Sequence, residues 1–443
     1  MLLTIALWIW IAACALALLQ GVLLGLHTWE HRRFARRRLA DQRPIDQTHR
    51  VALLAPCKGL DLELVSNLRH LLTQDYQNYE VVFIVESSDD PALTVIERLI
   101  QQETRVPARV IIAGRATVTG QKIHNLAVAT ANLGPAVEVL AFVDSDVRPA
   151  PEWLGRLVTR LSKADSGTIT GYRWFVPAKV TLANCLLYSI NASIAALLGA
   201  GGQHIVWGGS WAIRRADFDS LQIRESWNGT ISDDLVATRA VRAAGLPIEF
   251  EPICMTVSPM DYSLAGLGSF LRRQHMIGRI YAPRIWQQSL WLMIISSVAV
   301  LGAVGLIAGD IATGNGWSPW PVGFLLAWYA LQVYRGWVRL GLARVYVRDW
   351  TRPVAWAAWF DVWASPITLL YNTFVMCGAC FGSCIVWRGI TYHLDRQGCL
   401  ERVIQPASKP PPTDRQLRFD PAESLRDASD RSHVVPASVE KPS

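Results

Sequence analysis

The sequence predicts an α/β domain, built on a largely parallel sheet, that is joined to α-helical transmembrane segments. Apolar residues are concentrated at positions 1–26 and 287–386 of the 443-residue chain. Runs of this length suit helices that cross a bilayer, which takes about 20 residues. Between residues 51 and 171, short β-rich runs alternate with helix-length stretches. Such alternation is typical of a parallel sheet covered by helices.

Hydrophobic spacing places the elements of the α/β domain, which we expect to cover residues 51–286. Ligands of such sheets bind beyond the carboxyl ends of the strands, so polar residues there are the first candidates for a functional site. We expect strands at 51–55, 80–85, 109–113, 137–143 and 167–171, and helices at 61–73, 91–103, 121–132 and 152–162.

Residues 1–28 are expected to form a transmembrane anchor, because the run from Leu2 to Leu26 carries no charge. A cleaved signal peptide is the alternative, but it would begin with a basic segment. Here seven arginines follow the run, between Arg32 and Arg50. This basic juxtamembrane collar, residues 29–50, marks the cytoplasmic side and suits anionic lipid. No nucleic-acid motif accompanies the formal charge of +7, so no nucleic-acid partner is expected.

Residues 287–390 are expected to form transmembrane and interfacial helices. Segments 288–308, 319–341 and 364–387 are the spanning candidates, and the Trp-rich stretch 353–363 is expected to lie at the membrane surface. Pro, Ser, Asp and Lys dominate the end of the chain, so residues 400–443 are expected to form a disordered tail.

Two features leave alternatives open. The apolar segment 179–206 suits either an interfacial segment or a buried helix pair. Cys377, Cys380 and Cys384 have helical spacing, which suits small-residue packing between helices or a metal site. The eight cysteines have no disulfide-like framework, which indicates a reducing compartment.

Asp144 and Asp146 carry the strongest chemical signal. They flank Ser145 directly after the strand expected at 137–143. Two carboxylates in such a turn can hold Mg²⁺ or Mn²⁺, which neutralises a nucleotide diphosphate as it leaves. Turns and helix caps also use Asp, but the position at a strand's carboxyl end favours a functional role.

Glu86, Asp89 and Asp90 follow another expected strand and precede a helix, so both helix capping and donor binding suit them. Lys122 opens the helix expected at 121–132, where phosphate contact and simple solvation are both compatible with its position.

Asp233 and Asp234 begin an amphipathic segment that stops at Gly245. One of the pair can cap the helix, and the other can remove the proton of an acceptor hydroxyl. Trp207 and Trp211 flank Gly-Gly-Ser and suit either a sugar or the membrane surface.

In order and spacing, these motifs resemble those of ceramide glucosyltransferases, a branch of the family-2-type, GT-A-fold, inverting enzymes. The resemblance implies that Asp89 lies near the nucleotide, that Asp144 and Asp146 bind metal and diphosphate, and that Asp234 is the catalytic base. It covers roughly residues 1–395 and rests on Lys58-Gly59, Asp89-Asp90-Pro91, Lys122-Ile-His-Asn125, Asp144-Ser-Asp146, Gly209-Ser210, Asp233-Asp234 and Trp387-Arg388-x-x-x-Tyr392.

One signature of that family, (R/Q)xxRW, is incomplete here. Its counterpart, Arg273-Gln274-His275-Met276-Ile277, lacks the Arg-Trp pair that serves the diphosphate and the acceptor in the family. Arg279, Arg272 or His275 are expected to supply the positive charge from a shifted register. The acceptor or diphosphate region is therefore expected to contain Trp207, Trp211, Asp233, Arg273, Gln274, His275 and Arg279.

The sequence thus predicts inverting, non-processive transfer of a sugar from a nucleotide donor, expected to be a UDP sugar, to a lipid acceptor. The expected location is a bacterial inner membrane, with a multi-pass chain and a cytosolic catalytic domain. A processive polysaccharide synthase is one alternative, and a non-catalytic membrane partner with a decayed site is another. Acids kept at four separate loop positions argue against decay.

Overall fold

The computed structural model describes residues 1–41, 44–162, 166–314 and 318–405. Its α/β domain is built on a seven-stranded sheet in the order β3-β2-β1-β4-β6-β5-β7, in which β6 runs antiparallel to both of its neighbours and the other pairs are parallel. The predicted α/β class with a largely parallel sheet is therefore confirmed. The strands are β1 (Val51–Pro56), β2 (Tyr79–Val85), β3 (Ala108–Ile112), β4 (Val139–Val143), β5 (Thr168–Pro177), β6 (Ser210–Arg214) and β7 (Ile248–Met260).

Different helices cover the two faces of this sheet, because successive side chains of a strand point to opposite faces. On β1, Val51, Leu53 and Ala55 pack into the core with α2, α3 and α5, whereas Ala52 and Leu54 pack into the core with α4 and α9. Short helices α7 and α8 complete the second face. These helices are α2 (Leu64–Leu72), α3 (Pro91–Gln102), α4 (Gln121–Ala131), α5 (Trp153–Leu161), α7 (Arg215–Ser220), α8 (Ile223–Ser226) and α9 (Asp233–Ala243).

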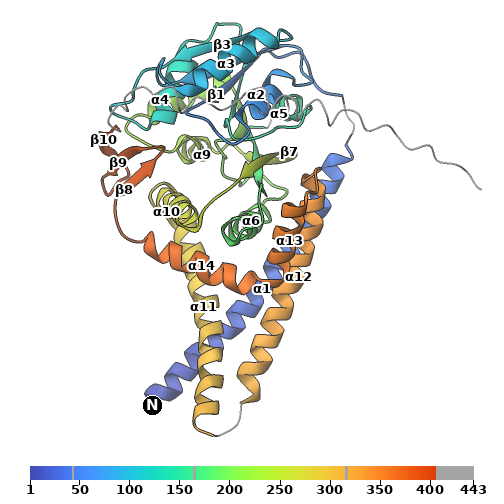
Figure 1. The fold of residues 1–443 in the computed structure, drawn as a ribbon, viewed down its shortest axis with the longest axis vertical. Helices are drawn as coiled ribbons and strands as arrows, with labels where there is room; N and C mark the ends of the chain where they lie inside the picture. The colour runs from blue at the N-terminus through green and yellow to red at the C-terminus, as the bar shows by residue number, and fades with distance from the viewer. Residues whose placement is uncertain (42–43, 163–165, 315–317, 406–443) are drawn as a thin grey trace, which may run out of the picture. The chain divides into compact units, whose positions relative to one another are not determined.

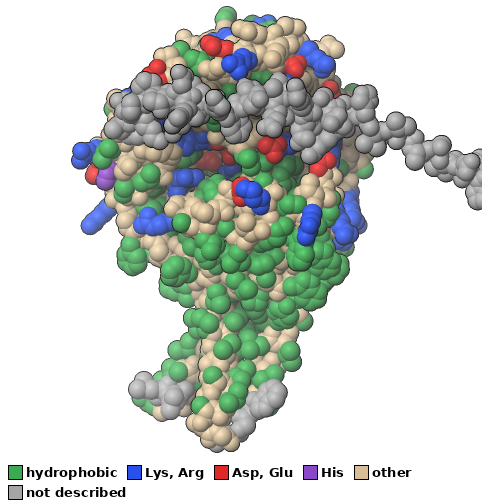
Figure 2. Space-filling view, in the orientation of Figure 1, with side chains coloured by type: hydrophobic (Ala, Val, Ile, Leu, Met, Phe, Trp, Pro, Cys, Tyr) green, Lys and Arg blue, Asp and Glu red, His purple; other side chains and the backbone are tan. Residues whose placement is uncertain are grey.

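Three long helices extend away from the sheet in Figure 1: α1 (Leu2–Leu39), α11 (Pro283–Ala312) and α12 (Pro319–Tyr346). Within the described part of the chain, Thr4–Leu39 and Pro283–Ala312 are the two helices long and apolar enough to cross a membrane. Hydrophobic side chains cover much of this region in Figure 2. The predicted span 288–308 lies within α11, and 319–341 lies within α12, which packs along α1 and α11.

The third predicted span, 364–387, is wrong. Helix α14 (Ser365–Gly378) ends nine residues earlier than expected, and its 14 residues give a length of only about 21 Å. A hydrocarbon core is about 30 Å thick, so α14 is too short to cross it. Cys384 lies in a strand rather than on α14, so the expected helical face of three cysteines does not form either.

The chain after α14 forms a three-stranded antiparallel sheet, with strand order β10-β9-β8. Residues Leu400–Ile404 are a strand, so the disordered tail predicted from residue 400 is wrong over these five residues. Residues 406–443 lie outside the described part. Ile385, Ile390 and Tyr392 pack into the core that contains α4 and α9, which anchors this sheet to the α/β domain. The strands are β8 (Cys384–Trp387), β9 (Ile390–Leu394) and β10 (Leu400–Ile404).

Helices α6 (Leu182–Ala195), α10 (Leu264–Tyr281) and α14 lie between the large sheet and the long helices in Figure 1. Helix α13 (Arg352–Trp363) runs alongside α12 and also packs against α6. Most of α6 is buried, so the segment predicted at 179–206 contains one buried helix rather than a pair. Arg339 of α12 forms a two-point ion pair with Asp361 of α13, both bonds 2.8 Å long, and Ser189 of α6 donates to Asp361 over 2.6 Å. This buried network joins three helices.

Candidate active site

A cavity of about 330 Å³ lies beyond the carboxyl ends of β1 and β4. This is where ligands of a parallel α/β sheet are expected. Segments far apart in sequence meet there: the turns after β1 and β4, the start of α4, one face of α10 and the β8–β9 hairpin. The lining comprises Pro56, Cys57, Lys58, Asp61, Gln121, Lys122, Asn125, Asp144, Ser145, Asp146, Arg173, Tyr262, Phe270, Arg273, Gln274, Trp387, Arg388, Ile390 and Tyr392.

The structure brings Asp144 and Asp146 to this cavity. Asp144 Oδ1 lies 2.8 Å from Lys122 Nζ, and Asp146 Oδ2 lies 3.4 Å from Arg173 Nη1. Burial opposes ionisation of Asp144, but the positive charges of Lys122 and Arg173 hold its pKa below the ordinary value. Burial raises the pKa of Asp146, against the attraction of Arg173. The turn thus presents two carboxylates in different electrostatic environments.

The donor set of Asp144 and Asp146 fits a shared divalent cation. Asp146 Oδ1 is buried and accepts no hydrogen bond, which leaves one carboxylate oxygen open to a ligand. Hard divalent cations prefer such oxygens and take their remaining ligands from phosphates and water. Over the described residues, no group of three or more His, Cys, Asp or Glu side chains is arranged to hold a metal ion alone. The two aspartates therefore suit a cation that is completed by oxygens of a bound diphosphate.

Lys122 connects the Asp144 turn to the start of α9. Its ammonium lies 2.8 Å from Asp144 and 3.1 Å from Asp233, and it donates to the Gly208 carbonyl over 3.3 Å. Burial raises the pKa of Asp233 to about 6, more than Lys122 lowers it, and Asp234 and Asp144 raise it further. Lys122 is therefore already bound by two carboxylates.

Asp234 lies directly beside this cluster but is not part of the cavity lining. Its Oδ1 accepts hydrogen bonds from Ser232 Oγ and the Leu235 amide, and its Oδ2 accepts from the Gly208 amide over 3.2 Å. Ser232 is the N-cap of α9, so the expected capping role falls on this serine, with Asp234 supporting it. A Cβ on Gly208 would lie 2.6 Å from Asp233 Oδ2, which explains why glycine is needed there.

The acids after β2 stand outside the cavity lining. Asp90 caps α3 by accepting from the Ala92 amide, and it also accepts from the Gly59 amide over 2.8 Å. Glu86 forms an ion pair with Lys58, and Asp89 is exposed. Helix capping and donor binding were both open for these acids, and Asp90 is the one that caps a helix, α3. Through Gly59, Asp90 also fixes the turn after β1.

Arg273 and Gln274 line the cavity, as expected for the diphosphate or acceptor region. The Arg273 guanidinium lies 5.2 Å from the Phe270 ring centroid and 5.4 Å from that of Trp387. Burial, together with the charges of Arg173 and Arg388, lowers its pKa to about 10, so it stays cationic at neutral pH. Its Nε is buried and has no hydrogen-bond partner, which makes it available to an anion.

The other α10 side chains that were expected to supply positive charge to the diphosphate are bonded away from the cavity. His275 bonds Asn372 of α14, while Arg279 donates to the carbonyls of Cys380 and Gly382. Arg272 donates to the Phe381 carbonyl over 3.0 Å. The expectation that these side chains supply charge to the diphosphate is wrong, because they hold the α14–β8 connection instead.

Of the two tryptophans beside Gly208-Gly209, only Trp207 lies close to the cavity, where its ring centroid is 5.1 Å from the Arg173 guanidinium. Trp211 is fully buried and stacks on Phe142 at 4.1 Å, so the expectation that it meets a sugar or the membrane surface is wrong.

Sequence reasoning missed several cavity residues. Asp61, Arg173 and Arg388 were not among the candidate site residues, although Arg388 belongs to the Trp387-Arg388-x-x-x-Tyr392 motif. Arg173 is a charged residue within the otherwise uncharged strand β5, and that contrast was an available signal. Asp61 carried none, since a lone acid in a turn is common.

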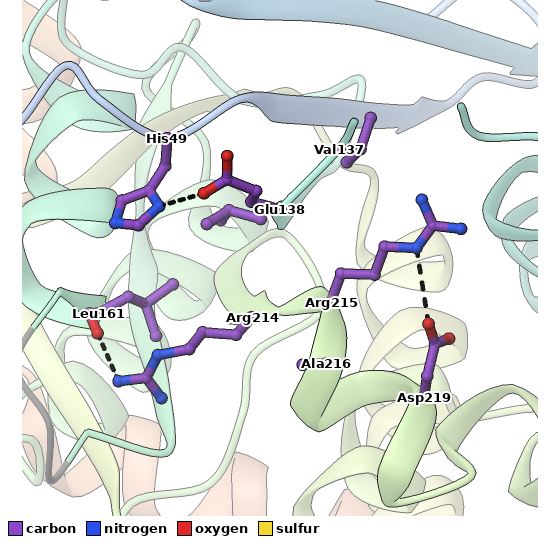
Figure 3. A pocket seen from close by; sticks show the side chains of 9 residues that line it. His49, Val137, Glu138, Leu161, Arg214, Arg215, Ala216 and Asp219 are labelled. Carbon is purple, nitrogen blue, oxygen red and sulfur yellow. Dashed lines mark hydrogen bonds and ion pairs between the residues drawn. The ribbon is translucent and has the colours of Figure 1, made fainter. Parts of the chain in front are cut away.

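A second cavity, of about 440 Å³, lies at the amino-terminal ends of β1 and β4 (Figure 3). His49 bonds Glu138 over 2.6 Å, Arg215 pairs with Asp219, and Arg214 donates to the Leu161 carbonyl. Because its charged groups satisfy one another at the edge opposite the strand carboxyl ends, the first cavity is the candidate active site.

The α/β fold and the cavity lined by Asp144 and Asp146 together define a GT-A-type domain carried on apolar helices. Residues 10–400 match the model of glycosyl transferase family 21. The chain therefore belongs to glycosyl transferase family 21, which confirms the resemblance described above.

Curated relatives match over short segments. A ceramide glucosyltransferase of Komagataella phaffii (strain GS115 / ATCC 20864) is 30% identical over 129 residues, which cover 28% of this chain and 25% of that protein. Ceramide glucosyltransferase 3 of Caenorhabditis elegans is 32% identical over 76 residues, 17% of each chain. The matches thus span a quarter or less of these relatives' lengths.

Among solved structures, the mannosyltransferase PcManGT from Pyrobaculum calidifontis, in complex with GDP-Man and Mn²⁺, is 18% identical with a TM-score of 0.47, covering 80% of this chain and 99% of that one. Glucosyl-3-phosphoglycerate synthase from Mycobacterium tuberculosis, in complex with Mn²⁺ and UDP-glucose, is 16% identical with a TM-score of 0.35, covering 53% and 79%.

Proposed function

We propose that this chain transfers a sugar, with inversion and without processivity, from a nucleotide donor to a lipid acceptor at the cytoplasmic face of a membrane. A UDP sugar is the expected donor. The observation that carries the proposal is the family match over residues 10–400, with Asp144 and Asp146 lining a cavity at the strand ends.

Asp144 and Asp146 would hold a divalent cation, Mg²⁺ or Mn²⁺, against the donor diphosphate. Such a cation, when bound, neutralises the charge that develops on the leaving diphosphate. The unpartnered Asp146 Oδ1 supports this role. Arg273, which has no carboxylate partner among the described residues, is the cation of this chain best suited to a diphosphate oxygen.

Asp234 is the proposed base. The acceptor hydroxyl attacks the anomeric carbon as the bond to the diphosphate breaks, Asp234 takes the hydroxyl proton, and the nucleoside diphosphate leaves with the bonding electrons. Hydrogen bonds from Ser232, Leu235 and Gly208 fix the orientation of the Asp234 carboxylate. Asp233, which is bound to Lys122, is less available for proton transfer.

A lipid acceptor is supported by the surroundings of the cavity. Helix α10 supplies Phe270, Arg273 and Gln274 to the cavity and is followed directly by the apolar helix α11. A hydroxyl on a lipid head group would thus meet the cavity next to helices suited to the bilayer.

The test uses the full chain in detergent with a panel of UDP sugars, Mn²⁺, Mg²⁺ or EDTA, and total lipid extract. Nucleoside diphosphate release and sugar in the lipid phase are measured. Asp234→Asn should abolish transfer, while Asp219→Asn, at a surface position, should not. Transfer that survives in Asp234→Asn would exclude this base. Failure of every nucleotide sugar to turn over would contradict the proposal and favour a non-catalytic membrane partner.

A further inference from the structure

Arg388 occupies an unusual backbone position at the tip of the C-terminal hairpin. Strands β8 and β9 are joined by the two-residue loop Arg388-Gly389, with φ angles of 48° and 81°. Positive φ at both positions is typical of a type I′ turn, which favours Asn or Gly at its first position. An arginine there is disfavoured, and such residues cluster at sites where other contacts hold them.

Those contacts reach the opposite side of the cavity. Arg388 Nη2 donates to Asp61 Oδ1 over 2.7 Å, and Nη1 donates to the carbonyl of Lys58 in the turn after β1. The planar guanidinium serves both acceptors at once, which an ammonium does less well. The hairpin is therefore joined to the turn after β1 by side-chain bonds as well as by its apolar core.

The contact continues from Asp61 into the turn between the two candidate metal ligands. Asp61 Oδ2 accepts a hydrogen bond from Ser145 Oγ over 2.7 Å, and Asn67 Nδ2 donates to the Ser145 carbonyl over 3.2 Å. Ser145 is only 4% exposed. The Asp61 carboxylate thus joins Arg388, which donates to its Oδ1, to Ser145, which donates to its Oδ2.

We propose that Arg388 is a positioning residue, which acts through Asp61 and Ser145 to hold Asp144 and Asp146 in the geometry that binds a metal nucleotide. Arg388 fixes the Asp61 side chain and compensates its negative charge. Without Arg388, Asp61 becomes an uncompensated carboxylate beside Asp144 and Asp146, and Ser145 loses an ordered acceptor. The inference rests on the proposed function for the identity of its ligand, a divalent cation with a nucleoside diphosphate.

If Arg388 had only a structural role in the turn, replacing it would have a different effect from the one that a positioning role predicts. Glycine adopts φ of 48° without steric cost, so Arg388→Gly relaxes the turn while it removes the guanidinium. If the turn only closes the hairpin, this variant should match or exceed the wild type. If Arg388 positions the aspartates, the variant should fold well but bind metal and nucleotide weakly.

The test titrates full-length protein in detergent with Mn²⁺ in the presence of UDP, followed by the electron paramagnetic resonance of free Mn²⁺, with thermal unfolding in parallel. Arg388→Gly should keep its melting temperature and weaken Mn²⁺ binding by about 10- to 100-fold, as for other residues that orient metal ligands. The Mn²⁺ affinity of Arg388→Lys should lie between those of the wild type and Arg388→Gly. Arg396→Gly, in the exposed β9–β10 turn, is the matched control and should bind as the wild type does.

A double-mutant cycle tests the connection itself. Asp61→Asn should weaken Mn²⁺ binding in the same direction, and Arg388→Gly combined with Asp61→Asn should be less damaging than the sum of the two changes. If Arg388→Gly bound Mn²⁺ with wild-type affinity, or if the two changes were additive, the positioning role of Arg388 would be wrong while the proposed function would stand. A wild-type protein that binds neither Mn²⁺ nor UDP would overturn the proposed function as well.

Discussion

The guanidinium of Arg273 lies 5.4 Å from the centroid of the Trp387 ring, and this contact joins α10 to the C-terminal hairpin across the cavity. Positions 276 and 277, where the family signature places Arg and Trp, hold Met276 and Ile277. An arginine and a tryptophan nevertheless meet in the cavity, one from each of two distant segments. The cavity thus contains an arginine–tryptophan contact, although positions 276 and 277 are not Arg and Trp.

Arg273→Ala is expected to weaken donor binding more than it slows the chemical step. A hydrogen bond to a charged group contributes about 1.5–3 kcal/mol, so the KM for the nucleotide sugar should rise roughly 10- to 100-fold. Arg273→Lys should recover only part of this loss, because lysine cannot stack or donate two parallel bonds. Steady-state kinetics check this, with Arg272→Lys as the control on the same helix. An unchanged KM would show that Arg273 does not meet the donor.

Lys122→Met should abolish activity and lower stability together. The change leaves Asp144 and Asp233 without the ammonium that lies 2.8 Å and 3.1 Å from them. Leaving a buried charge uncompensated costs about 3–5 kcal/mol. We expect at least about a 100-fold loss of turnover, equivalent to about 2.7 kcal/mol, and a lower melting temperature.

Lys122→Met combined with Asp233→Asn gives the control for that prediction. Removing one of the two negative charges should restore much of the melting temperature but not the activity. If the double variant melts no higher than Lys122→Met, charge compensation is not the reason for the loss.

The α/β part of the fold was predictable because its signals are local. The strands from Val51 to Val143 are short and mostly apolar, and Asp144 follows the last of them directly. The C-terminal region was not predictable in this way. The residues from Phe374 to Trp387 are apolar or small enough to continue a helix, and the chain leaves it to place Ile385 and Tyr392 in a core formed by α4 and α9.

The same distinction applies to the site. Asp144 and Lys122 were found because each lies at the end or start of an element. Arg173 and Arg388 lie far from Asp144 in the sequence, and neither the lone charge in β5 nor the motif around Arg388 shows that they meet it. Only the fold brings them to the same cavity. Trp211 was assigned to a ligand or the membrane because glycines precede it, yet β6 alternates and turns it onto Phe142. Contacts of that kind depend on strand pairing, which the sequence pattern does not specify.

Breaking the Arg339–Asp361 pair should destabilise the chain without changing the chemistry of the site. Both side chains are 3% exposed and joined by two 2.8 Å bonds. Loss of one partner costs about 3–5 kcal/mol, so Arg339→Met or Asp361→Leu should lower the melting temperature clearly, whereas the double variant should recover most of it.

The exposed pair Arg348–Glu152 provides the contrast, because its arginine is 71% exposed and its bond has the same 2.8 Å length. Exposed ion pairs contribute about 0–1 kcal/mol to the free energy of unfolding, so Arg348→Met should have a melting temperature close to that of the wild type. Thermal unfolding of the variants in one detergent decides this. Equal losses for Arg339→Met and Arg348→Met would show that burial of the first pair does not control its contribution.

The stability of the α9 start should depend on pH through Asp233. Its pKa is about 6 in the folded chain, because burial outweighs the attraction of Lys122, and close to 4 when unfolded. The folded state therefore binds the proton more tightly, and this contribution is complete below about pH 4 and is lost as the pH rises through about 6. Asp233→Asn removes the titration. The melting temperature of the wild type relative to Asp233→Asn should fall between pH 4.5 and 6.5 and then level off, whereas Asp219→Asn should show no such trend. A difference between wild type and Asp233→Asn that is constant or rises over this range would contradict the raised pKa.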